Sequence, residues 1–251
     1  MHLPKAHAVR DLPTLYEFVL KNPLGILTTA IKSDLHPTIQ VSHIPWVLDY
    51  QDKDADSLPR LRGHIARQNP HARAMVESAQ GDSSTANSRG MKLQDEVVVL
   101  FNSPANHYVS PQFYTHTKPT TGKVVPTWNY CAVQAYGTAT IFADSKSEVT
   151  GKFLSEQLQD LTTLGETHIM GHESPWKVGD APENHIGLLS KNIIGIEIEI
   201  TSMEGRFKLS QDKHVLDREG VVAGFRGLET RDGAHMADMV ASASADPAIA
   251  K

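Results

Sequence analysis

The chain has 251 residues, enough to bury the core of one large domain, and its net charge of -5 gives no general attraction to nucleic acid or anionic membranes. No apolar run approaches the roughly 20 residues of a membrane helix, and the start of the chain lacks a secretory signal core. Cys131 is the single cysteine, which excludes an intramolecular disulfide and predicts a reducing compartment: the cytoplasm, or the nucleus if the protein is a regulator.

The first part of the chain predicts one helix followed by strands. Asp11 is a suitable N-cap, with Pro13 in the first turn, for a helix that ends near Pro23. Two β-rich runs should then pair across a turn, and Pro45 indicates an edge or a bulge in the second. The elements expected next are strands over 24–31, 37–48 and 61–67, a surface turn over 51–58, a helix over 70–79 and a mobile loop over 80–90.

The second part predicts more strands than helices. In order, we expect a central strand over 96–101, an irregular aromatic segment over 104–114, a polar loop over 115–123, a long strand reaching about residue 142, a helix over 147–161, an aromatic segment over 168–182, strands over 193–200 and 205–211, and a short helix from about 212. We predict a single domain over 1–228 and a flexible tail over 229–251. Short turns between strands favour an antiparallel barrel with added helices over a doubly wound sheet.

Residues 125–137 are the centre of the functional prediction. Pro126 precedes Trp128, Asn129 and Tyr130, and an alternating strand pattern follows. Aromatic faces beside an amide suit a planar cofactor with polar edges, such as a flavin. The alternative is that Trp128 and Tyr130 are ordinary core aromatics whose polar tips are satisfied.

Three other segments carry candidate polar groups. Arg67 and Asn69 lie where a strand ends and a helix begins, so they could hold a phosphate, although Asn69 could equally be a plain helix cap. Tyr108 and Ser110 lie in a turn upstream of Trp128 and would wall the same pocket if the segments are neighbours. Lys208, followed closely by Gln211, offers a cation and an amide at a strand end, but a solvated lysine is the commoner outcome.

Other chemistries have less support in the sequence. Ser42-His43 lacks the Gly-x-Ser-x-Gly elbow of a hydrolase, and Cys131 is expected to be a small buried hydrophobe rather than a reactive thiol. Dinucleotide and nucleoside-triphosphate loops are missing, and no His-Glu-x-x-His pair is present, so no metal site is predicted.

Taken in order, several segments resemble the PaiB-like family of FMN-binding negative transcriptional regulators. The strongest piece is the Pro-Thr-Trp-Asn-Tyr run. The matching pieces are 1–4, 42–45, 63–70, 105–111, 125–130 with Gly137, 175–176, 194–196 and 208–211, and together they cover roughly residues 1–225.

The resemblance implies a mainly β split barrel of the pyridoxamine-phosphate-oxidase type, a homodimer, and FMN near the subunit interface. It also implies the cofactor-binding set. That set comprises His64, Arg67, Asn69, Tyr108, Ser110, Trp128, Asn129, Tyr130, Lys208 and Gln211. Asp212 departs from the asparagine usual in the family and would place a carboxylate beside a phosphate held by Lys208. The 80–90 and 117–123 loops also look longer than the family pattern.

Three functional hypotheses remain open. The first is an FMN-dependent oxidoreductase, for which the sequence identifies neither a substrate nor a catalytic residue. The second is a regulator that does not use its flavin catalytically, but direct binding to DNA lacks a helix-turn-helix with a basic face. The third is a haem-binding or haem-degrading protein, with His43, His64 and His107 as candidate ligands.

Overall fold

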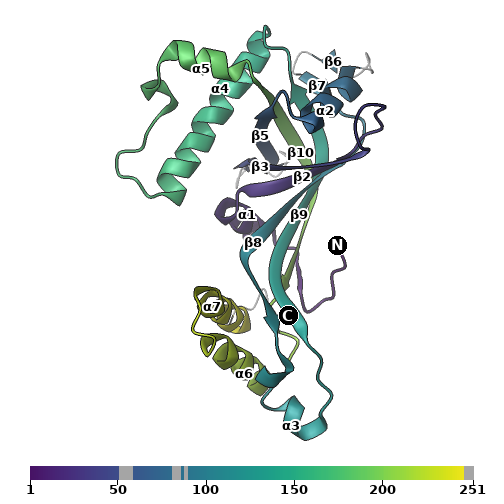
Figure 1. Ribbon diagram of the computed structural model, residues 1–251, viewed down its shortest axis with the longest axis vertical. Helices are drawn as coiled ribbons and strands as arrows, with labels where there is room; N and C mark the ends of the chain where they lie inside the picture. The colour runs from purple at the N-terminus through teal and green to yellow at the C-terminus, as the bar shows by residue number, and fades with distance from the viewer. Residues whose placement is uncertain (51–58, 81–85, 88–89, 246–251) are drawn as a thin grey trace. The chain divides into compact units, whose positions relative to one another are not determined.

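The computed structural model describes residues 1–50, 59–80, 86–87 and 90–245, and these residues are mainly β with added helices (Figure 1). One ten-stranded sheet has the order β3-β2-β8-β9-β10-β5-β4, with β1 beside β10 and β7 beside β6 and β9. Its neighbours pair antiparallel, as in β2–β3, β2–β8 and β5–β10. The predicted antiparallel sheet with added helices is therefore confirmed.

The bounds of the elements follow the predicted order closely. In sequence they are β1 (Ala8–Val9), α1 (Leu12–Lys21), β2 (Leu24–Ala30), β3 (Ile39–Pro45), β4 (Val47–Asp49), β5 (Arg60–Ala66), α2 (Pro70–Gln80), β6 (Ala86–Asn87), β7 (Gly90–Lys92), β8 (Val97–Val109), the short helix η1 (Pro111–Phe113), α3 (Thr117–Thr121), β9 (Thr127–Phe142), α4 (Glu148–Thr163), η2 (Leu164–Ile169), η3 (Val178–Asp180), α5 (Glu183–Ser190), β10 (Ile193–Lys208), α6 (Val215–Arg226) and α7 (Arg231–Ala245). No described helix is both long and apolar enough to cross a membrane.

Contacts divide the chain into two compact units. The first consists of Met1–Asn22, Phe101–Gln134 and Met203–Lys251, and the second of Pro23–Leu100 and Ala135–Ser202. The strands β8, β9 and β10 each contribute one part to either unit. A single domain over 1–228 stays a prediction.

In the second unit, the hairpin of β2 and β3 runs in register from Leu24 opposite Pro45 to Ala30 opposite Ile39. Strand β5 pairs with β10, and the isoleucines of β10 that alternate with glutamates are buried. The helix α4 covers this part of the sheet through Phe153, whose ring stacks on Phe142 with centroids 4.0 Å apart. These contacts bury the apolar side of α4, as its helical spacing predicts.

Two glycines permit close packing in the second unit. A Cβ on Gly137 would lie 2.2 Å from the carbonyl oxygen of Glu199, and one on Gly195 would lie 2.4 Å from the ring of Phe153. Real Cβ atoms do not approach so closely, so each position requires glycine for steric reasons rather than for backbone freedom.

In the first unit, α1 begins as predicted at Asp11, whose carboxylate accepts a hydrogen bond of 3.0 Å from the backbone N–H of Thr14. The helix buries Leu15 and Val19. It packs near the end of β10, where the rings of Phe18 and Phe207 lie 5.1 Å apart.

The C-terminal helices correct one prediction. From residue 229 the sequence predicts a flexible tail, but Arg231–Ala245 forms α7, which packs against α6. Its buried side chains follow one helical face, and α6 supplies their partner. They are Met236, Ala237, Val240 and Ala243. An alanine-rich composition conceals this face because the buried residues are small.

The hairpin of α6 and α7 is fixed to the segment after β8. Buried Asp217 accepts hydrogen bonds from the backbone N–H groups of His116 and Thr117 at 2.8 and 3.0 Å, and another from the Thr117 hydroxyl. Burial raises the pKa of Asp217, but these hydrogen bonds outweigh it and hold the pKa below its usual value. Gly220 and Gly224 let α6 approach Phe113 closely.

Three further segments differ from the prediction. Residues 104–109, expected to be irregular, continue β8, and alternate side chains from Ser103 to Ala105 and on to Val109 are buried. The sequence does not predict this strand, because the segment is rich in polar residues and contains Pro104, and proline is rare in strand interiors. The helix α5 was not predicted, and a short helix, α3, lies in the predicted polar loop. The predictions for 51–58 and for most of 80–90 fall outside the described residues.

Candidate functional site

The segment at the start of β9 presents its side chains alternately to two sides. Trp128 is 49 % exposed, whereas Asn129 and Cys131 are 0 % and 3 % exposed. Burial raises the pKa of the Cys131 thiol to about 12, so it is a buried hydrophobe, as predicted. Successive residues of a strand point to opposite faces, so this one stretch serves both a surface and the core.

The outward side carries an aromatic group. The rings of Trp128 and Tyr108 meet edge to face with centroids 6.2 Å apart, and the indole N–H of Trp128 donates a 3.0 Å hydrogen bond to the side-chain oxygen of Asn106. Tyr108 is 44 % exposed. A large exposed aromatic pair, oriented by an amide, is typical of a binding surface rather than of a core.

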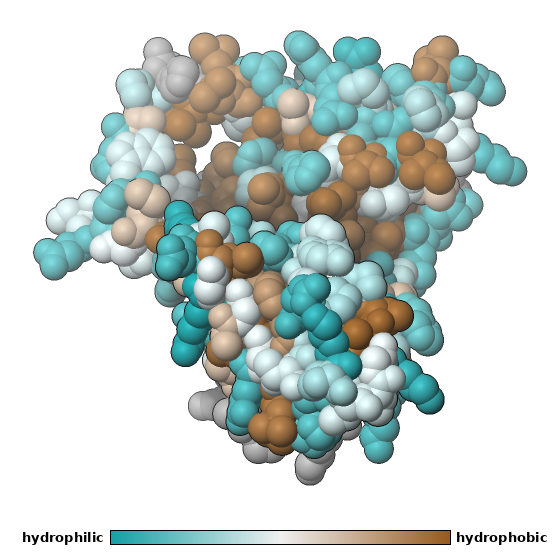
Figure 2. Space-filling view, turned by 60° about the horizontal axis from the view of Figure 1, so that its bottom comes forward, coloured by the Kyte–Doolittle hydropathy of each residue, from teal (hydrophilic) through white to brown (hydrophobic). Residues whose placement is uncertain are grey.

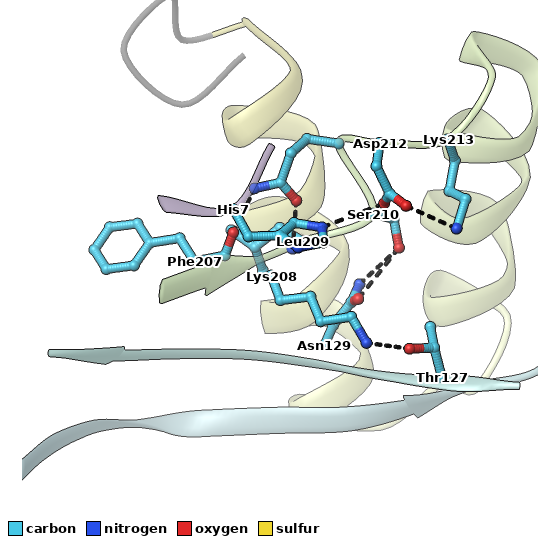
Figure 3. Close-up of polar contacts among 10 residues, drawn as sticks. His7, Thr127, Asn129, Phe207, Lys208, Leu209, Ser210, Asp212 and Lys213 are labelled. Atoms are coloured by element: carbon cyan, nitrogen blue, oxygen red, sulfur yellow. Dashed lines mark hydrogen bonds and ion pairs between the residues drawn. The ribbon is translucent and has the colours of Figure 1, made fainter. Parts of the chain in front are cut away.

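Two cations on β10 contact residues at the start of β9. The guanidinium of Arg206 lies 5.7 Å from the centroid of the Tyr130 ring, and its Nε is buried without a hydrogen-bond partner among the described residues. Lys208, two residues further along β10, donates to the hydroxyl of Thr127 (Figure 3). Burial, and then the charge of Arg206, lower the pKa of Lys208. An anion at this position would satisfy Arg206 and favour the charged form of Lys208.

Arg206 was missed in the sequence. The spacing of Arg206 and Lys208, two residues apart in a strand, places both on the same face and is the signal that could have identified it.

The buried side of the same stretch locks the turn after β10. The side-chain amide of Asn129 donates to the Ser210 hydroxyl at 3.1 Å, and that hydroxyl lies 3.2 Å from the Asn129 oxygen, to which it can donate (Figure 3). Ser210 has a φ of 61°, a left-handed conformation that serine rarely adopts. The hydrogen bonds to Asn129 compensate for this strain.

Gln211 and Asp212 complete the turn without reaching outward. Gln211 accepts from the backbone N–H of Leu209 at 2.7 Å and donates to the carbonyl oxygen of Phe207. Asp212 lies between His7, at 3.4 Å, and Lys213, at 2.8 Å. The charge of Lys213 therefore balances the carboxylate that departs from the family pattern, whereas burial lowers the pKa of His7 and favours its neutral form. No ion pair joins Asp212 to Lys208 within the described part of the chain.

Three further predicted residues lie in the second unit, where each already has a protein partner. The Nδ1 of His64 lies 2.8 Å from the side-chain oxygen of Gln157. Arg67 donates from Nε and Nη2 to the carbonyl oxygens of Lys191 and Ile193, both at 3.1 Å. Asn69 accepts from the backbone N–H of His71 at 2.9 Å, the helix cap that the sequence offered as the alternative. Their binding of a phosphate stays a prediction.

The structure thus brings together part of the predicted set. Within the first unit it groups Tyr108 with Trp128, Asn129 with the turn that contains Gln211, and Tyr130 with the strand that ends at Lys208. Ser110 caps the short helix η1 by accepting from the backbone N–H of Gln112 at 3.2 Å.

The candidate haem ligands have different neighbours in the fold. His43 lies opposite Ile26 in the β2–β3 hairpin of the second unit, and His107 in the first unit packs edge to face on Phe225 with centroids 5.3 Å apart. The described residues also hold no group of three or more His, Cys, Asp or Glu that could bind a metal ion.

Comparison with known families decides the assignment. The family model described as "Putative FMN-binding domain" matches residues 1–202. The chain belongs to this FMN-binding family. The predicted cofactor, FMN, is therefore supported, and the family gives no support to haem.

Two relatives of this FMN-binding family member each cover 96% of the chain. An uncharacterized protein of Aspergillus fumigatus is 51% identical over 251 residues, covering 96% of each chain. The Bacillus subtilis protein named protease synthase and sporulation protein PAI 2 is 24% identical over 240 residues, again covering 96% of each chain. Among solved structures, a pyridoxamine 5'-phosphate oxidase-related, FMN binding protein of Nostoc punctiforme is 7% identical with a TM-score of 0.37, covering 82% of this chain and 86% of its own.

The residues of the first unit fit the chemistry of FMN. A flavin needs a flat apolar contact for its ring and cations for its phosphate. The exposed pair of Tyr108 and Trp128 offers the first. The Nε of Arg206, which has no hydrogen-bond partner among the described residues, and the destabilised charge of Lys208 offer the second.

Proposed function

We propose that the protein is a split-barrel flavoprotein that holds FMN on the outward face of the first unit and uses it for electron transfer. Trp128 and Tyr108 would contact the ring, and Arg206 with Lys208 would neutralise the phosphate. The observation that carries the proposal is the Nε of Arg206, which is buried without a hydrogen-bond partner among the described residues, on the same strand as a lysine whose pKa is lowered. Two such cations, neither of which forms an ion pair with a described residue, favour an anionic ligand.

When bound, FMN supplies hydride or single-electron transfer. The chain's own groups would bind and orient it. The hydrogen bond from Trp128 to Asn106 restricts rotation of the indole, and the edge-to-face contact with Tyr108 keeps the apolar surface continuous. The buried bonds between Asn129 and Ser210 hold the end of β10, and so the backbone of Lys208, in place. A site built in advance in this way loses less entropy on binding.

A titration with FMN, followed by quenching of flavin fluorescence, tests the assignment. We expect Arg206→Met and Lys208→Met each to weaken binding by about 10-fold or more, since a charged hydrogen bond contributes about 1.5–3 kcal/mol. Trp128→Ala should weaken it by a similar factor. Trp176→Ala is the matched control, because Trp176 is also exposed, at 46 %, but lies in the second unit.

The possible results separate clearly. If the wild type binds FMN and the three variants bind it equally well, the flavin lies elsewhere and this face is not its site. If the wild type remains colourless and does not take up added FMN, the flavoprotein reading fails as a whole. Failure of Trp176→Ala alone to bind would place the ring in the second unit.

We also propose that the chain forms homodimers through the outward side of the β2–β3 hairpin. This side exposes apolar residues at the edge of the sheet, with Leu24, Ile39 and Val41 exposed by 57 %, 66 % and 56 %. A regular apolar face on an edge hairpin is typical of a protein interface. Sedimentation of Ile39→Lys with Val41→Lys should show a monomer. The control Leu35→Lys, at a position 77 % exposed, should keep the wild-type mass.

Regulation of transcription by direct contact with DNA is not proposed. The net charge is -5, and the arginine Arg226 on the exposed helix α6 is paired with Asp238 at 3.5 Å. A gel shift with genomic fragments at low salt should show no retardation. We place the flavoprotein in the cytoplasm, which fits its single, buried and unreactive cysteine.

A further inference from the structure

The helices α6 and α7 form an open groove that the FMN site does not use. Its volume is about 740 Å³, within the range of small-molecule sites. One side of α6 supplies most of its wall, because residues three, four and seven apart share a face. Among the residues that line it are Val215, Arg218, Glu219, Val222, Arg226 and Ala241.

The central cation of this groove lacks a partner. The Nε of Arg218 is buried and makes no hydrogen bond, and no carboxylate of the described residues lies within ion-pair distance of its guanidinium. Arg226, two turns further along α6, has only an exposed contact with Asp238 at 3.5 Å. A buried N–H of a charged group that is left unsatisfied is costly, so this position is suited to an acceptor from outside the chain.

The rest of the wall is apolar and open. Val215 is 48 % exposed at one end of the groove, and Val222 lies about two turns further along α6 on the same face. The small side chain of Ala241 on α7 leaves the groove unfilled. The face shown in Figure 2 carries separate hydrophobic patches among hydrophilic ones, not one continuous apolar surface. The charged residues of the lining are Arg218, Arg226 and Glu219, which leave one positive charge in excess beside short apolar stretches. This lining matches a ligand with a single anionic group on an apolar chain.

We propose that the α6–α7 groove binds an amphiphilic organic carboxylate, with its anionic group on Arg218 and its apolar chain between Val222 and Ala241. Arg218 can offer two parallel N–H groups to a carboxylate. Both helices lie after residue 202, where the matched FMN-binding region ends.

Calorimetric titration of the full chain with octanoate tests the proposal, with acetate and 1-octanol as probes of the head and the chain alone. We expect saturable binding of octanoate, and binding of acetate and octanol at least about 10-fold weaker. Arg218→Met should weaken octanoate by about 10- to 100-fold, and Arg218→Lys by less. Ala241→Phe should abolish binding by filling the groove while Arg218 stays in place.

Arg10→Met is the matched control, since Arg10 is exposed outside the groove and its substitution causes the same change in net charge. It should bind octanoate like the wild type. Thermal unfolding of every variant identifies any that fails to fold. If Arg218→Met does not fold, the octanoate affinity of Ala241→Phe tests the proposal instead.

Three outcomes would overturn the proposal. The first is an absence of octanoate binding by the wild type. The second is that Arg218→Met and Ala241→Phe both bind octanoate as tightly as the wild type does. The third is a change in sedimentation of Ala241→Phe without octanoate binding, which would make the groove an interface between copies of the chain. None of these measurements depends on FMN, so the flavin site and the groove stand or fall separately.

Discussion

Protonation of buried His71 should make the protein markedly less stable in mild acid. The ring is 1 % exposed and lies between two hydroxyls, with Nδ1 2.9 Å from the Ser42 oxygen and Nε2 3.0 Å from the Thr29 oxygen. A neutral imidazole satisfies both contacts by donating once and accepting once. Burial lowers the pKa of His71 from 6.5 to about 4.

The sign and size of the effect follow from this difference. Between pH 6.5 and 4 the unfolded chain binds a proton at His71 that the folded chain does not, so stability is full above pH 6.5 and falls as the pH decreases. A difference of about 2.5 pKa units corresponds to about 3 kcal/mol in total, and to about 2.5 kcal/mol at pH 4.5. Below pH 4 this residue causes no further loss.

Urea unfolding at pH 7.5 and at pH 4.5, for the wild type and for His71→Gln, measures the effect. Glutamine keeps one donor and one acceptor and does not titrate. We expect the free energy of unfolding of the wild type to fall by about 2.5 kcal/mol more than that of the variant. Other titrating groups cancel in this comparison. Equal losses for the two proteins would show that the ring is not held neutral, and would refute the reasoning.

Three further predictions concern stability. Gly137→Ala should lower the free energy of unfolding by about 3 kcal/mol, because its Cβ would lie 2.2 Å from the Glu199 carbonyl. In urea unfolding Gly151→Ala, in open space on α4, should instead raise it by up to about 1 kcal/mol; a loss at both positions would contradict the steric explanation. Asp217→Ala should cost about 2–4 kcal/mol and speed proteolysis near Thr117, whereas exposed Asp232→Ala should do neither. Ser210→Gly should lower the free energy of unfolding much less than Asn129→Ala does, since glycine adopts the φ of 61° freely. An equal loss in the two variants would show that the side-chain hydrogen bonds matter more than the backbone strain.

Elements with local signals could be predicted from the sequence. Asp11 caps α1 and Pro70 opens α2, and in both cases the responsible residues lie within the first turn. By contrast, α7 depends on burial of small residues such as Ala237 against α6, and no local pattern announces such a partner. Elements stabilised mainly by distant packing are the ones that were missed.

The candidate site shows the same division. The Pro-Thr-Trp-Asn-Tyr run directs the prediction to one segment because it is contiguous, and strand alternation then predicts that Trp128 and Asn129 face opposite ways. The spacing of Arg206 and Lys208 is the one sequence signal for Arg206, but its position over Tyr130 is a contact between two strands distant along the chain and is known only from the structure. The register between strands is a property of the fold as a whole.

The exposed side of the 125–137 stretch forms the proposed cofactor contact, and its buried side supports the turn after β10, so the two sides need separate variants. Asn129 is fully buried and bonded to Ser210, so its removal loosens the turn that follows Lys208. Trp128 is exposed and held by Asn106, so its removal leaves the core intact. A double variant of the two would lose FMN affinity through either route. Trp128→Ala alone therefore reports on contact with the cofactor, and Asn129→Ala alone on the support behind it. If both single variants weaken FMN, only the second should also lower stability.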